Sequence, residues 1–126
     1  EPATCSPRPV KGDIPVIVGG DSEPALKRAV RIADGYFPGE GDSGELGKLL
    51  ARLRQTAEAS DRDPASIEVS AIFGAQMMDP ANGVEQMAAV GVDRIMVPAF
   101  FFTGPEGLDN LRKFTEEVIP IAREVS

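Results

Sequence analysis

A pair of glycines directly after a short apolar run is the part of the sequence best suited to bind a ligand. Residues 14–18 form the run IPVIV, and Gly19, Gly20, Asp21 and Ser22 follow it. Glycines at such a place let a ligand come close to the backbone. The free N–H groups at the start of a following helix favour an anion, and Ser22 adds a hydroxyl. The motif is compatible with a phosphate site, although a glycine pair before a helix is often only a tight turn.

The residue types exclude several other chemistries. The 126 residues contain no histidine and one cysteine, Cys5. Histidine-based triads, general bases and metal sites are therefore ruled out, as are an internal disulfide and a multi-cysteine metal site. Cys5 lies in a proline-rich segment without a histidine to activate it, so we expect no nucleophile there. We predict no metal site, and the catalytic residues are unknown.

The charge balance limits the possible partners. Thirteen Lys and Arg against 20 Asp and Glu give a net charge of −7. This acidic balance argues against nucleic acids and anionic membranes, which need clustered cations. No apolar run approaches the length of about 18 residues that a transmembrane helix requires. The chain lacks a secretory signal pattern and begins with Glu-Pro, so we expect a trimmed or excised cytoplasmic protein.

Four strand–helix units are expected to position the glycine pair. Residues 1–13 read as a proline-rich lead-in loop and residues 14–126 as one domain. Strands are predicted to start near residues 14, 35, 67 and 92, the first of them buried on both faces. Helices are predicted after the glycine pair, over about residues 43–59, from Pro80 to Gly91, and from Gly104. Pro120 should kink or end the last helix, whose inward residues should be Leu108, Leu111, Phe114, Val118 and Ile121.

Strict alternation of strands and helices implies parallel strands with right-handed crossovers. Two architectures remain open: a doubly wound sheet, such as a flavodoxin-like domain, and half of a (β/α)8 barrel. In both, sites lie where strands end, which adds residues 37–40, 74–76 and 98–104 to the glycine turn. A half-barrel would have two open edge strands and would need a partner, either the missing half or a second copy.

Two clusters near these strand ends are each compatible with two roles. Phe100, Phe101 and Phe102 cannot all face one core, so they should line a pocket or interface or pack under the last helix. Met77 and Met78 follow the third strand, where they fill core space or offer an adaptable surface. Tyr36, the only tyrosine, is expected to be a half-buried strand residue.

Residues 14–38, IPVIVGGDSEPALKRAVRIADGYFP, resemble the luciferase-like monooxygenase superfamily, most closely its branch that uses the deazaflavin coenzyme F420. The shared features are a strand ending in Gly-Gly, a Ser-Glu-x-Ala-Leu-x-Arg-Ala helix start, and Ala-Asp-Gly-aromatic after the helix. The segments at residues 6–10, 91–95 and 108–120 also resemble this family.

The resemblance implies that the chain is the C-terminal half of a TIM barrel, which binds its flavin or deazaflavin at the C-terminal face. Transferred to this sequence, the cofactor-binding positions are Gly19, Gly20, Ser22, Phe37, Pro38 and Gly39. The implied function is hydride transfer between coenzyme F420, or alternatively FMN, and an unknown small organic substrate. The family's residues around the reactive ring come largely from the N-terminal half, so catalysis by this chain alone is left open. The alternative is a non-catalytic half-barrel module that homodimerises.

Overall fold

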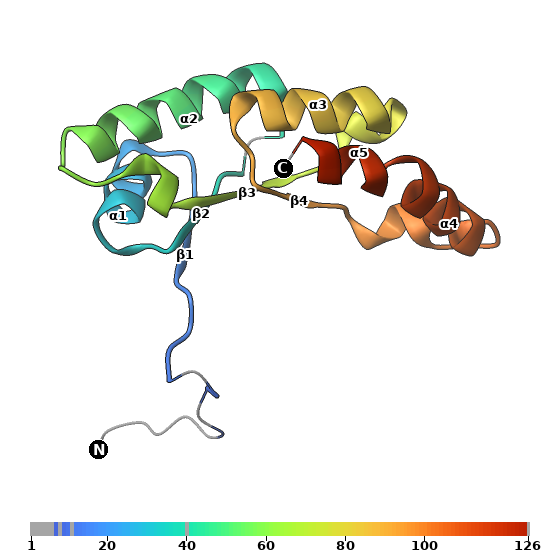
Figure 1. Ribbon diagram of the computed structural model, residues 1–126, viewed down its shortest axis with the longest axis horizontal. Coiled ribbons are helices and arrows are strands. Elements are labelled where there is room, and N and C mark those ends of the chain that lie inside the picture. Colours follow the sequence, from blue (N-terminus) through green and yellow to red (C-terminus); the bar gives the residue numbers. More distant parts are fainter. Residues whose placement is uncertain (1–6, 8, 11, 40, 126) are drawn as a thin grey trace.

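The computed structural model describes residues 7, 9–10, 12–39 and 41–125 as four parallel strands with helices between them (Figure 1). The strands are β1 (Ile17–Gly19), β2 (Gly35–Phe37), β3 (Glu68–Ile72) and β4 (Arg94–Met96). They pair in the order in which they occur in the chain. A doubly wound sheet reverses its strand order, whereas sequential order is that of a (β/α)8 barrel. The α/β class with four βα units is confirmed, and its topology is that of part of a barrel.

The helices form a layer on one side of the sheet. They are α1 (Glu23–Ile32), α2 (Ser43–Glu58), α3 (Pro80–Val90), α4 (Gly107–Glu117) and α5 (Ile119–Glu124). Neighbouring helices pack side by side, α1 on α2, α2 on α3 and α3 on α5, and α2, α3 and α5 lie above the strands in Figure 1. Single turns of 3-10 helix precede β3 (Pro64–Ser66) and follow β3 (Ala75–Met78) and β4 (Ala99–Phe102). No helix in the described ranges is long and apolar enough to cross a membrane.

Local sequence signals set the helix ends. The Asp42 side chain accepts hydrogen bonds from the N–H groups of Gly44 and Glu45, which caps the start of α2. Gly91 ends α3 in the left-handed region, with φ of 93°. The predicted break at Pro120 is confirmed, because α4 ends at Glu117 and α5 begins at Ile119.

The core lies between the helices and one face of the sheet. Side chains alternate along each strand, so Val18, Tyr36, Val69 and Ala71 share the face that the helices cover, and all four are buried. The opposite face, called here the open face, carries Ile17 and Met96, which are 51% and 49% exposed. The prediction of a first strand buried on both faces is therefore wrong, because the described helices cover only one face and β1 is an edge strand.

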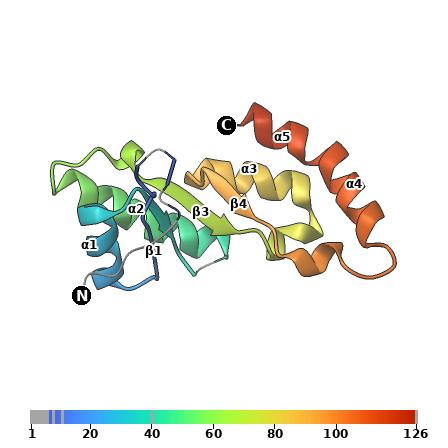
Figure 2. The ribbon, with the colours of Figure 1, turned by 90° about the horizontal axis from the view of Figure 1, so that it is seen from below.

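The last helices are also less buried than their pattern predicted. Leu108 and Leu111 were expected to point inward but are 61% and 43% exposed, whereas Val118 is buried. The reason is position: α4 extends past the end of the sheet, so no described element covers its outer half (Figure 2). Packing under the last helix is confirmed for Phe102, whose ring meets that of Phe114 edge-on at 5.5 Å. Phe100 remains 68% exposed.

Two aspartates close strand–helix–strand modules at the end of the sheet opposite the glycine turn. Asp34, just before β2, donates its N–H to the Val16 carbonyl at 2.8 Å, and its carboxylate accepts the Val16 N–H at 2.7 Å. Asp93, just before β4, makes the same pair of bonds with Val69, at 2.9 and 2.7 Å. Each aspartate thus joins the start of one strand to the start of its neighbour.

Candidate functional site

The glycine turn at the end of β1 is anchored by the neighbouring strand. Gly20 has φ of 107°, a conformation that side chains with a Cβ rarely adopt. Its N–H donates to the Phe37 carbonyl at 3.3 Å, and its own carbonyl accepts the Tyr36 hydroxyl at 2.7 Å. Gly19 and Gly20 are both exposed. The turn therefore presents an open stretch of backbone that β2 holds in place.

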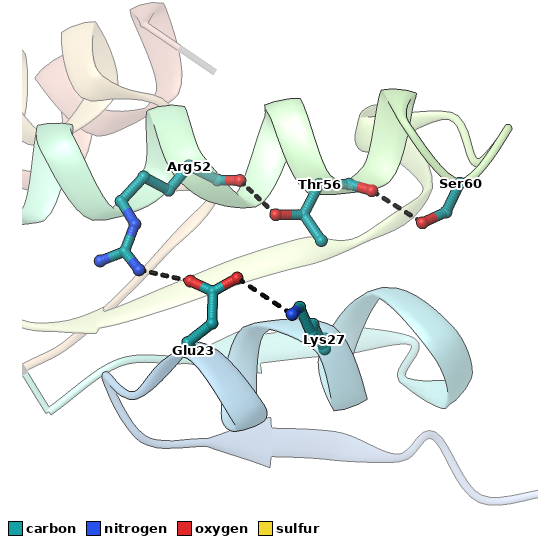
Figure 3. A network of polar contacts seen from close by, with 5 residues as sticks. All are labelled: Glu23, Lys27, Arg52, Thr56 and Ser60. Atoms are coloured by element: carbon teal, nitrogen blue, oxygen red, sulfur yellow. Dashed lines mark hydrogen bonds and ion pairs between the residues drawn. The ribbon is translucent and has the colours of Figure 1, made fainter.

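The acidic side chains beside this turn are engaged elsewhere. The Asp21 carboxylate accepts the N–H of Gly39 at 2.8 Å, which joins the turn after β1 to the loop after β2. Glu23 pairs with Lys27 at 3.7 Å and with Arg52 of α2, as Figure 3 shows. An anion at the start of α1 would therefore meet carboxylates whose charge is shared with donors or cations.

Ser22 occupies the N-cap of α1 but leaves its side chain uncommitted. Its backbone is extended, with φ of −78° and ψ of 153°, and its hydroxyl makes no capping hydrogen bond. The residue is exposed, and its carbonyl accepts the N–H groups of Ala25 and Leu26. The first N–H groups of a helix carry partial positive charge, so this hydroxyl and the helix start together form an anion-binding arrangement.

The predicted positions in the loop after β2 differ in exposure. Phe37 is half-buried, Pro38 is buried and Gly39 is exposed. Because the Gly39 N–H is donated to Asp21, this loop offers close approach rather than a free donor there. Glu40, which belongs to the same strand-end segment, and Cys5 lie outside the described residues.

Gln76 also joins two of the loops that follow strands. From the sequence it was expected only as part of the strand-end segment 74–76. Its Nε2 donates to the Gly41 carbonyl at 2.8 Å, so it joins the loop after β3 to the loop after β2. Its Oε1 is buried without a hydrogen-bond partner among the described residues. Polar contacts thus connect three successive strand ends, whereas no side-chain hydrogen bond between described residues links these loops to residues 98–104.

Tyr36 is more buried than expected and supports the turn from beneath. Its side chain is fully buried. Burial, and to a smaller extent the negative charge of Asp21, raises the pKa of Tyr36 from 10.0 to about 12. The phenol therefore keeps its proton, and with it the bond to Gly20, at any pH near neutrality.

Stability at high pH should report this buried phenol. Since the folded-state pKa lies above the unfolded value, the stabilisation is complete below pH 10 and is lost as pH rises from about 10 to about 12. Across this window we expect the free energy of unfolding to fall by roughly 2 kcal/mol more in the wild type than in Tyr36→Phe. Urea denaturation of both proteins on either side of the window measures the difference, and parallel pH profiles would contradict it.

Comparison with known proteins places this chain in a family. Residues 1–113 match the family model described as luciferase-like monooxygenase. The chain belongs to this family. The luciferase-like monooxygenase match includes all four strands and the glycine turn, and it ends inside α4.

Relatives and solved structures add the following similarities. The chain is 35% identical over 115 residues to the uncharacterized proteins Mb0965c of Mycobacterium bovis and Rv0940c of Mycobacterium tuberculosis. These alignments cover 84% of this chain and 38% of each relative, so the chain spans well under half of their length. DmoA from Hyphomicrobium sulfonivorans matches with a TM-score of 0.44 and 18% identity, over 86% of this chain and 22% of that one. That similarity is too low to transfer a function.

Proposed function

We propose that this chain is part of a flavin- or deazaflavin-dependent oxidoreductase, in which the turn after β1 binds the phosphate of the cofactor. The observation that carries the proposal is the exposed Gly20, with its positive φ, next to the uncommitted Ser22 hydroxyl at the start of α1. Members of the luciferase-like monooxygenase family use flavin or deazaflavin cofactors, which combine a tricyclic ring system with a phosphate on its side chain. We propose coenzyme F420, with FMN as the alternative, because residues 14–38 resemble the F420 branch.

The residues present fit a phosphate group. Gly20 is exposed and has no Cβ, so a ligand can approach the backbone there, and Ser22 can donate its hydroxyl. At Gly19 the missing Cβ instead leaves room for β2, because a Cβ would lie 3.3 Å from the Phe37 carbonyl oxygen. Phe37 and Gly39 would border the bound cofactor, and the buried Pro38 would shape the loop from beneath. When bound, the cofactor supplies the hydride chemistry, and this chain supplies its position.

The proposal also includes a substrate class, a location and a partner for this chain. We propose a small organic substrate, a cytoplasmic location, and a chain that corresponds to the C-terminal half of a barrel. The missing N-terminal half, or a second copy, would then cover the open face. A non-catalytic homodimer is the second candidate, favoured by the exposed Ile17 and Met96 and by the unpaired edges of β1 and β4.

Ligand fluorescence provides the test, since the chain contains no tryptophan to interfere. The chain is titrated with FMN and with riboflavin, which has the same ring but no phosphate. We expect FMN to bind at least about tenfold more tightly, because charge-assisted hydrogen bonds to phosphate are strong. Equal affinities, or no binding of either, would contradict a phosphate site in this chain. Titration with F420 then distinguishes the branches, because tighter binding of F420 than of FMN supports the deazaflavin and the reverse supports FMN.

A further inference from the structure

A groove between α1 and α2 lies on the outside of the helical layer, and its volume is about 780 Å³. Its lining includes the cations Lys27, Arg31 and Arg62, the carboxylate of Glu23, and the apolar Val30 and Ala59. We call it the α1–α2 groove. Figure 3 looks into it from the side, with Glu23 and Lys27 on one wall and Thr56 and Ser60 on the other. Its volume is within the range of small-molecule sites.

The charge of this groove is opposite to that of the whole chain. Three cations face one carboxylate in a chain of net charge −7. That carboxylate, Glu23, is itself shared between Lys27 and Arg52. The groove is therefore a positively charged area on an acidic protein, which attracts anions locally.

The three cations differ in how free they are. The Arg62 guanidinium donates to the carbonyls of Ala29, Val30 and Ala33, so its hydrogen bonds are used by the end of α1. Lys27 is loosely paired with Glu23, at 3.7 Å. Arg31 makes no side-chain hydrogen bond or ion pair with any described residue. Arg31 is thus a charged group that lines the groove and is available to a ligand.

We propose that the α1–α2 groove binds an organic anion, an apolar body that carries a phosphate, sulfonate or carboxylate. Arg31 and Lys27 would bind the anionic group, and Val30 and Ala59 would contact the apolar body. Arg31 lies away from the cofactor turn, because it follows Ser22 by nine residues, which is about 13 Å along a helix. The site does not depend on the proposed oxidoreductase function.

The test uses 2-naphthyl phosphate as the anionic probe and 2-naphthol as its neutral counterpart. Binding is followed by the shifts of backbone amide signals in the NMR spectrum of the 126-residue chain. We expect the phosphate to shift signals of residues 27–31 and 55–62, and 2-naphthol to bind at least about fivefold more weakly. Inorganic phosphate alone should also bind more weakly, because it lacks the apolar body. Equal binding of 2-naphthol, or shifts confined to the glycine turn, would overturn the proposal.

Single substitutions sharpen this test in both directions. Arg31→Gln should weaken 2-naphthyl phosphate binding about fivefold to tenfold, whereas Arg28→Gln should change it less than about twofold. Arg28 is a matched control, because it is an exposed arginine of the same helix that does not line the groove. Glu23→Gln should strengthen binding, since it removes the one carboxylate that lines the groove and frees Lys27 from it. Equal losses in Arg28→Gln and Arg31→Gln would reduce the effect to general charge attraction and overturn the site.

Discussion

Gly20→Val is expected to weaken the binding of a phosphate-bearing cofactor by about a hundredfold or more. Two causes act together. A Cβ at Gly20 would lie 3.4 Å from the Cβ of Ala25, so a branched side chain would crowd the start of α1, where the phosphate is proposed to bind. It would also be strained at φ of 107°, which should shift the N–H groups at the start of α1. Fluorescence titration with FMN or F420 measures the loss.

The strain and the steric effect can be separated. Gly104 also has a positive φ, 83°, and a Cβ there would meet nothing within 4 Å. Gly104→Val is therefore a control with comparable backbone strain away from the turn, and it should retain cofactor affinity within about twofold of wild type. If both variants lost affinity equally while remaining folded by circular dichroism, the turn after β1 would not be the phosphate site.

Arg62→Ala is expected to lower the free energy of unfolding by about 3 kcal/mol. The Arg62 guanidinium lies at the C-terminal end of α1, where it donates to the carbonyls of Ala29, Val30 and Ala33. Val30 and Ala33 are buried, so removing the donor leaves their carbonyls with little access to water, whereas the Ala29 carbonyl still accepts the Ala33 N–H. A positive charge is also favourable at the negative end of a helix. Urea denaturation followed by circular dichroism measures the change.

Two further variants test this explanation. Arg62→Lys keeps the charge but cannot reach three carbonyls at once, so it should recover only part of the loss. Arg54→Ala removes an exposed arginine with one bond to the Val90 carbonyl, and should lower the free energy of unfolding by less than about 1 kcal/mol. An Arg62→Ala protein as stable as Arg54→Ala would show that the carbonyls of α1 are satisfied by water instead.

The sequence predicts those features that local chemistry determines. The helix expected over residues 43–59 is α2, Ser43–Glu58, because the Asp42 cap and the spacing of the leucines act within a few residues. The sequential sheet order was one of two alternatives, since both architectures have the same alternation of strands and helices. The exposure of Ile17 and Leu108 was not predictable in the same way, because it depends on which faces another element covers.

In the candidate site, too, local features are predictable from the sequence and long-range contacts are not. The position of Gly19, Gly20 and Ser22 at a strand end follows from the order of the residues. The bonds that hold them do not, because they join segments that are distant in sequence. Tyr36 to Gly20 spans 16 residues, Asp21 to Gly39 spans 18, and Gln76 to Gly41 spans 35. Such pairs depend on how closely neighbouring strand ends approach, which composition and spacing do not encode.

The paired bonds of Asp34 and Asp93 have a consequence for exchange of segments between homologous proteins. Each aspartate closes one strand–helix–strand module, the first from Val16 to Asp34 and the second from Val69 to Asp93. A crossover point between α2 and β3 takes the first closure entirely from one parent and the second entirely from the other. A crossover inside α1 or α3 places the two halves of a closure in different parents. Chimeras built from this family should therefore recombine most readily at residues 63–67, which also keeps Arg62 in the same parent as the α1 carbonyls that it contacts.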